Sequence, residues 1–150
     1  MDSSSQKQKM EFKPFVNSDR QDNIKQPLVL AVDDNEDNLL LIIQVLKLLG
    51  CSCISSKDGE TAVFMAQNYQ PDLILLDIML PDLNGVEVIH RLKQDPRTMM
   101  IPIVAVTAMA RAEDRERVLL AGCNDYLKKP YIIHELEATI RRYLYQTDFL

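Results

Sequence analysis

The sequence predicts an α/β fold in which a parallel β-sheet carries helices on both faces. From Pro27 onward, five short strand-like runs alternate with five longer segments of helical periodicity. The run 73–76 is apolar at every position and ends at Asp77, which is typical of a strand that is buried on both faces and stops at the rim of a sheet. Because crossovers between parallel strands are right-handed, this alternation favours a doubly wound fold.

Turn and cap residues set the boundaries of these elements. Gly50 and Gly122 follow two of the periodic segments, where glycine commonly ends a helix. Pro81 and the polar cluster 82–85 predict a loop soon after Asp77, and Pro102 marks the start of the fourth strand. We expect strands at 28–32, 51–55, 73–77, 103–107 and 125–127, and helices at 36–49, 60–68, 85–93, 112–121 and 132–144.

Composition excludes several classes of protein. A chain of 150 residues is most simply one domain with a real core. Its net charge of −5 argues against a nucleic-acid-binding surface, which needs a clustered excess of cations. No apolar stretch approaches the roughly 18 residues of a membrane span, and the polar start is unlike a signal peptide. Cys51, Cys53 and Cys123 lack metal-ligand spacing, so we expect reduced core cysteines in a cytoplasmic protein.

The first 26 residues differ in composition from the rest of the chain. They are rich in Ser, Gln, Asn, Asp and Lys, with Phe12, Phe15 and Val16 as an isolated apolar group. We expect a flexible N-terminal arm at 1–26 and a folded domain at 27–150, because so little apolar surface does not fold by itself. The alternative is that Phe12 and Phe15 dock on a partner or on the domain.

Polar residues lie at the carboxyl ends of four of the predicted strands, either closing the strand or directly after it. They are Asp33, Asp34, Asp77, Thr107 and Lys129. In a parallel sheet these ends meet at one edge, which is where ligands bind in open α/β folds. Three carboxylates in one crevice repel each other unless a cation lies between them, and a set of oxygen ligands suits Mg²⁺. A hydroxyl and an ammonium beside them are groups that bind a phosphoryl group. From its own stretch alone, Asp77 could equally be a residue that caps the next turn.

Four segments together resemble the receiver domain of two-component response regulators. They are Val32-Asp33-Asp34-Asn35, Leu76-Asp77-Ile78-Met79-Leu80-Pro81 with Gly85, Val106-Thr107-Ala108, and Lys128-Lys129-Pro130. The complete set in this order and spacing is highly specific, and the resemblance covers 27 to about 144. It implies a flavodoxin-like (βα)5 fold with a five-stranded parallel sheet in the order 2-1-3-4-5.

The resemblance also implies a role for each residue at this edge. Asp77 would accept a phosphoryl group from a phosphohistidine of a histidine kinase or a phosphotransfer protein. Asp34, Asp77 and the backbone carbonyl of Met79 would bind Mg²⁺ directly, and Asp33 partly through water. Lys129 would pair with the Asp77 carboxylate and then with the phosphoryl oxygens, and Thr107 would move to hydrogen-bond one of those oxygens. Such a domain catalyses only its own phosphorylation and dephosphorylation, so it is not an enzyme acting on other substrates.

Two surfaces are expected to pass the signal to other proteins. The resemblance implies a switch of Thr107, Ala108 and Tyr126, which would alter the face of the fourth helix, the fifth strand and the fifth helix and its contacts with a downstream protein. Many similar domains form homodimers through this face. The first helix has a second apolar stripe, for which we expect docking of the phosphodonor or a partner subunit, with cover by the N-terminal arm as the alternative. This stripe consists of Leu39, Leu40, Ile43 and Leu46. The opposite arc is expected to face the sheet, and it consists of Asn38, Leu41, Ile42, Val45, Leu48 and Leu49.

Other functions fit the sequence less well. A phosphatase of the haloacid dehalogenase type needs a second acid two residues after the nucleophile, where this chain has Met79. A receiver-fold scaffold that is not phosphorylated would be expected to lack Asp77, Lys129 or the acidic pair. The chain could be a stand-alone regulator, or a receiver excised from a hybrid histidine kinase. His90 and His134 have no metal-ligating partners at useful spacing and are expected on the surface.

Overall fold

The structure is a computed structural model that describes residues 26–108 and 111–145. Most of the predicted N-terminal arm, including Phe12 and Phe15, lies outside the described residues, so its flexibility and docking stay predictions. Among the described residues, no helix is both long enough and apolar enough to cross a membrane.

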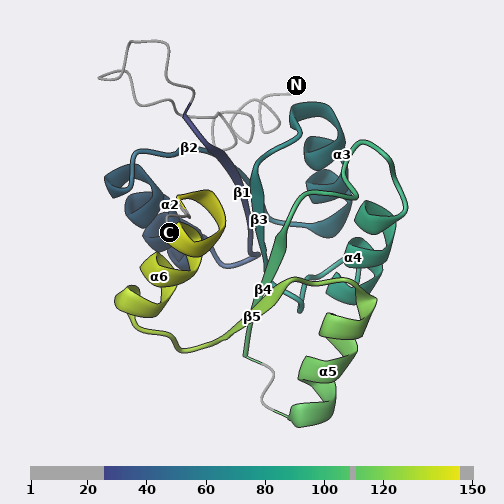
Figure 1. Cartoon of the computed structure of the whole chain (residues 1–150). Coiled ribbons are helices and arrows are strands. Elements are labelled where there is room, and N and C mark those ends of the chain that lie inside the picture. The colour runs from purple at the N-terminus through teal and green to yellow at the C-terminus, as the bar shows by residue number, and fades with distance from the viewer. Residues whose placement is uncertain (1–25, 109–110, 146–150) are drawn as a thin grey trace, which may run out of the picture.

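A five-stranded parallel sheet forms the centre of the molecule (Figure 1). Its strands are β1 (Leu28–Val32), β2 (Ser52–Ser56), β3 (Leu73–Leu76), β4 (Ile103–Thr107) and β5 (Asp125–Lys128). They lie in the order β2-β1-β3-β4-β5, which confirms the predicted flavodoxin-like order. Every pair is parallel, with Val32 opposite both Ser56 and Leu76. The carboxyl ends of these strands therefore share one edge.

Helices cover both faces of this sheet (Figure 1). They are α2 (Glu36–Leu48), α3 (Gly59–Tyr69), α4 (Gly85–Lys93), α5 (Ala112–Ala121) and α6 (Ile133–Leu144). Helices α3, α4 and α5 pack against one core and α2 and α6 against the other. Each buried strand supplies both cores, because alternate side chains point to opposite faces; Leu30 and Val32 of β1 join the first core and Val29 and Ala31 the second.

The predicted element boundaries differ from the observed ones by one residue at most. Strand β3 ends at Leu76, so Asp77 lies just beyond it. Side-chain caps explain several helix starts: Asn35 accepts from the Asn38 N–H at α2, and Asp58 accepts from the Thr61 N–H at α3. Gly122 ends α5 with φ +120°, a conformation that disfavours other residues. The three cysteines are buried and free, as predicted.

The predicted exposed stripe of α2 is wrong. Leu39 and Leu46 are buried, with exposed fractions of 4% and 0%, and Ile43 packs partly buried against the same core. Of the four predicted docking residues, Leu40 alone is largely exposed, whereas Leu41 and Leu48, expected to face the sheet, are also exposed. Apolar residues occupy most positions of this helix, so two arcs are nearly equally hydrophobic and contacts with the sheet and α6 decide which is buried.

Candidate functional site

Pairing between β1 and β3 brings two acidic residues together at the carboxyl edge. The Asp77 N–H donates to Val32 O (2.9 Å), so Asp77 continues the pairing beside Asp33. The Asp33 N–H in turn donates to Ser56 O at the end of β2 (3.1 Å). Asp33 and Asp77 are 1% and 5% exposed. Two carboxylates are therefore held by the backbone in a site with little solvent, where they need a compensating cation.

Lys129, which directly follows the edge strand β5, supplies one such cation. Its Nζ lies 2.8 Å from Asp33 Oδ2 and 3.2 Å from Asp77 Oδ2, after reaching past the end of β4. The Lys129 N–H donates to Thr107 O (2.8 Å), and the following peptide bond to Pro130 is cis. Pairing with Asp77 was expected from the resemblance, whereas the shorter contact with Asp33 was not.

Asp34 completes an acidic cluster that fits a divalent cation. It is exposed, and Asp33, Asp34 and Asp77 each offer a carboxylate oxygen, all lying within 4.8 Å of one another. The donors are oxygen atoms only, one from an open position and two from buried ones, which is the ligand chemistry of Mg²⁺. Asp77 Oδ1 also accepts from the Met79 N–H (3.0 Å), so Asp77 does cap the next turn as well as joining the cluster.

Further hydrogen bonds hold Asp33 in place. Its Oδ1 accepts from the Asn35 N–H (2.9 Å), and its Oδ2 accepts from Asn38 Nδ2 (3.3 Å) in addition to Lys129. Sequence reasoning assigned Asn38 to the sheet-facing side of α2 and missed this contact. The available signal was its place in the first turn of the helix that follows the acidic pair.

The pKa values of Asp77 and Lys129 are both raised above their ordinary values, for different reasons. Burial raises the pKa of the Asp77 carboxyl, against the opposing effects of the Met79 N–H and the Lys129 ammonium. Burial alone would lower the pKa of Lys129, but its hydrogen bond to Asp33 and the nearby charges of Asp77 and Asp33 raise it above its ordinary value. Lys129 is therefore a permanent cation at neutral pH.

The three predicted switch residues belong to β4, to the residue after it and to β5. Thr107 ends β4 and is fully buried, and Ala108 follows it and is exposed. Tyr126 is opposite Ala105 on β5 and packs partly buried against the first core. The Arg115 guanidinium lies 5.8 Å from the centre of its ring.

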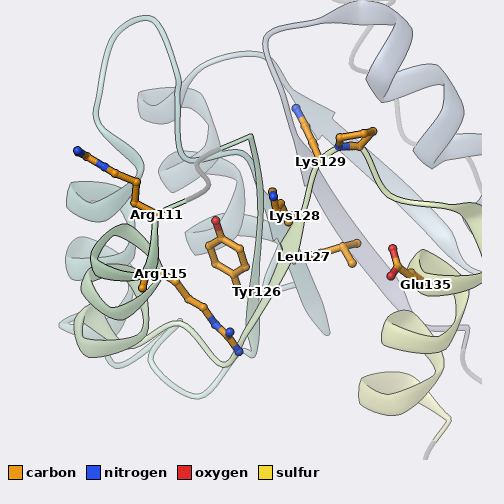
Figure 2. A pocket seen from close by; sticks show the side chains of 9 residues that line it. Arg111, Arg115, Tyr126, Leu127, Lys128, Lys129 and Glu135 are labelled. Atoms are coloured by element: carbon orange, nitrogen blue, oxygen red, sulfur yellow. The ribbon is translucent and has the colours of Figure 1, made fainter.

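Tyr126 and Arg115 line a hollow of about 600 Å³ between α5, β5 and the start of α6; Figure 2 shows the side chains around it. Its lining includes Arg111, Arg115, Tyr126, Lys128 and Glu135. Three exposed cationic side chains, those of Arg111, Arg115 and Lys128, thus line the hollow that Tyr126 lines, on a chain whose net charge is −5. His90 and His134 are exposed on helices, as expected.

Solved structures define the class of protein first. A chemotaxis response regulator of Vibrio cholerae, CheY4, is 26% identical with a TM-score of 0.76, over 80% of this chain and 100% of that chain. The receiver domain of a sensor histidine kinase from Pseudomonas aeruginosa PAO1 is 36% identical with a TM-score of 0.73, over 79% and 98%. That structure holds a magnesium ion coordinated in its active-site cleft. The chain is thus a flavodoxin-like α/β protein of the CheY type.

Sequence comparison then defines the family. The model of the response regulator receiver domain matches residues 29–141, most of the chain. The polar-differentiation response regulator DivK of Brucella anthropi is 40% identical over 116 residues, which are 77% of this chain and 94% of that protein. The chain belongs to the response regulator receiver domain family.

Proposed function

We propose that this protein accepts a phosphoryl group on Asp77 from a phosphohistidine of a histidine kinase or a phosphotransfer protein. The observation that carries this proposal is the arrangement around Asp77: Lys129 Nζ lies 3.2 Å from its carboxylate, within a cluster that includes Asp33 and Asp34. Phosphoryl transfer needs chiefly positioning and charge neutralisation, and these residues provide both. The role applies equally to a stand-alone regulator and to a receiver excised from a hybrid kinase.

The proposed reaction is an in-line substitution at phosphorus. An Asp77 carboxylate oxygen forms a bond to phosphorus while the bond between phosphorus and the donor imidazole nitrogen breaks, and the imidazole keeps the electron pair and takes up a proton. Bound Mg²⁺ would add positive charge at the phosphoryl oxygens, and Asp33, Asp34, Asp77 and the Met79 carbonyl would hold it. Lys129 would exchange its contact with Asp77 for one with a phosphoryl oxygen. The protein modifies itself and turns over no other substrate.

The face of α5, β5 and α6 carries the output in this proposal. Thr107 would move to donate its hydroxyl hydrogen to a phosphoryl oxygen, past the exposed Ala108, and the ring of Tyr126 would turn into the space that Thr107 leaves. This is a shift between two packings of the same core, so it changes the hollow beside Tyr126. The cations of Arg115 and Lys128 suit a downstream protein that presents carboxylates.

Intact-mass measurement with acetyl phosphate tests the proposal. We expect the wild-type chain to gain the mass of one phosphoryl group when acetyl phosphate and Mg²⁺ are both present, and to gain none with EDTA. Asp77→Asn is the matched control, because it keeps the side-chain volume and removes the nucleophile. A gain that survives in Asp77→Asn would contradict the assignment of the acceptor.

If acetyl phosphate does not label the wild-type chain, a phosphorylated histidine donor protein is tried next. Labelling by that donor would restore the proposal with a strict donor requirement. No labelling by either donor would support a receiver-fold scaffold that acts without phosphorylation.

A further inference from the structure

The loop between β3 and α4 is tied to the start of α3 by one carboxylate. Asp82 Oδ1 accepts from the Gly59 N–H (2.8 Å), and Asp82 Oδ2 accepts from the Glu60 N–H (3.0 Å). Both donors are first-turn amides, which have no partner within their own helix. The contact spans more than twenty residues of sequence, so it fixes the loop in space.

Helix α3 has its own N-cap, so Asp82 is an additional contact. Asp58 accepts from the Thr61 N–H (2.7 Å), the donor that a local cap ordinarily takes. Burial opposes ionisation of Asp82, but the backbone amides that it accepts from, those of Gly59 and Glu60 among them, together outweigh burial and lower the pKa of this carboxyl, so it is charged at neutral pH. A negative charge at a helix N-terminus is also favoured by the helix dipole.

Close packing strengthens the same contact. A Cβ atom added to Gly59 would lie 2.8 Å from Leu83 Cβ and 3.3 Å from Leu83 O. Glycine is therefore required where the loop rests on the first turn of α3. The loop is thus both hydrogen-bonded to the first turn of α3 and closely packed against it.

From the start of α3, hydrogen bonds continue to the acidic pair. Ser56 Oγ donates to Asp58 O (2.8 Å) and accepts from the Asp58 N–H (3.3 Å), while Ser56 O accepts from the Asp33 N–H (3.1 Å). The loop that holds Met79 and the loop that holds Asp33 are thus connected through β2 and α3. Asp34, Met79 and Asp82 also line one common hollow of about 510 Å³.

We propose that Asp82 is a positioning residue for the divalent-cation site: it holds the loop that carries the Met79 carbonyl at a set distance from Asp33 and Asp34. This inference rests on the proposed function, because it assumes that these groups bind Mg²⁺. Asp82 itself does not bind the ion. Its effect on the site is to reduce the motion of the ligand-bearing loop before the ion arrives.

The test is a Mg²⁺ titration of the full chain without any phosphodonor, monitored through the amide chemical shifts of ¹⁵N-labelled protein. We expect Asp82→Ala to weaken Mg²⁺ binding about tenfold, in the range observed when residues that support a metal site are removed. Asp82→Asn keeps one oxygen acceptor, so its Mg²⁺ affinity is expected to lie between those of Asp82→Ala and the wild type. With acetyl phosphate, the Mg²⁺ concentration for half-maximal labelling should rise while labelling at saturating Mg²⁺ stays near wild type.

Asp58→Ala is the matched control for a purely structural effect. It removes the local cap of the same helix and leaves the loop untouched, so it should lower the melting temperature without changing Mg²⁺ affinity. Equal Mg²⁺ affinity in Asp82→Ala, Asp82→Asn and wild type would overturn the inference. If the wild-type chain binds Mg²⁺ but is never labelled, the proposed function fails, and the titration still decides the role of Asp82.

Discussion

Lys129 is the residue on which charge balance at the site depends. Its ammonium lies within 3.2 Å of both Asp33 and Asp77, which are buried, and its own side chain is 19% exposed. Removing a cation from such a pair leaves charges that solvent reaches poorly, and this penalty exceeds the small value of a surface ion pair. In the proposed reaction, the same ammonium would contact a phosphoryl oxygen without any change in its protonation.

Lys129→Met should therefore lower the free energy of unfolding by about 2 kcal/mol in EDTA buffer. The neighbouring Lys128, which is exposed, gives the matched control Lys128→Met, with an expected change within about 0.5 kcal/mol. Urea unfolding followed by circular dichroism measures both. Equal stability of the two variants would mean that the buried carboxylates do not depend on this ammonium.

At the scale of elements, α2 shows how packing chooses between two apolar arcs of one helix. Leu39, Ile42, Val45 and Leu46 are buried against the second core, and Leu48, two residues beyond Leu46, is 82% exposed. The helix has the same composition whichever arc faces inward, so periodicity alone could not decide. Position relative to β1 and α6 decides it, and that is a property of the folded chain.

Leu46→Ala and Leu48→Ala test this assignment on one helix with one chemical change. We expect Leu46→Ala to lower the free energy of unfolding by about 3 kcal/mol, because it opens a cavity in a fully buried site. Leu48→Ala should change it by less than about 0.5 kcal/mol. Chemical denaturation of the two variants gives the comparison. The reverse order of stabilities would support the arc predicted from the sequence, in which Leu48 faces the sheet and Leu46 faces outward.

At the scale of the whole molecule, sheet topology assembles the site from four separate segments. The acidic pair, Asp77, Thr107 and Lys129 were predictable, because each ends or follows a strand and parallel strands end at one edge. The contacts of Asn38 with Asp33, and of Asp82 with α3, were not, since each depends on how a helix start is placed in space. Sequence patterns thus locate groups at strand ends better than groups that support them from elsewhere.

The link from Asp77 to the face of α5 and β5 also belongs to this scale. If Thr107 transmits phosphorylation, Thr107→Val should still gain one phosphoryl group but lose most of the amide shift changes at Arg115, Tyr126 and Lys128. Valine keeps the shape of the buried side chain and removes the hydroxyl. ¹⁵N spectra with and without acetyl phosphate and Mg²⁺ measure this.

Thr139→Val is the control for removing a buried hydroxyl elsewhere. Thr139 Oγ1 donates only within α6, to Glu135 O (2.9 Å), so this variant should keep the full response. A full response in Thr107→Val would show that the signal reaches Tyr126 by another route. Movement of Lys129 is one such route, because its backbone N–H is hydrogen-bonded to Thr107 O of β4 and it directly follows β5.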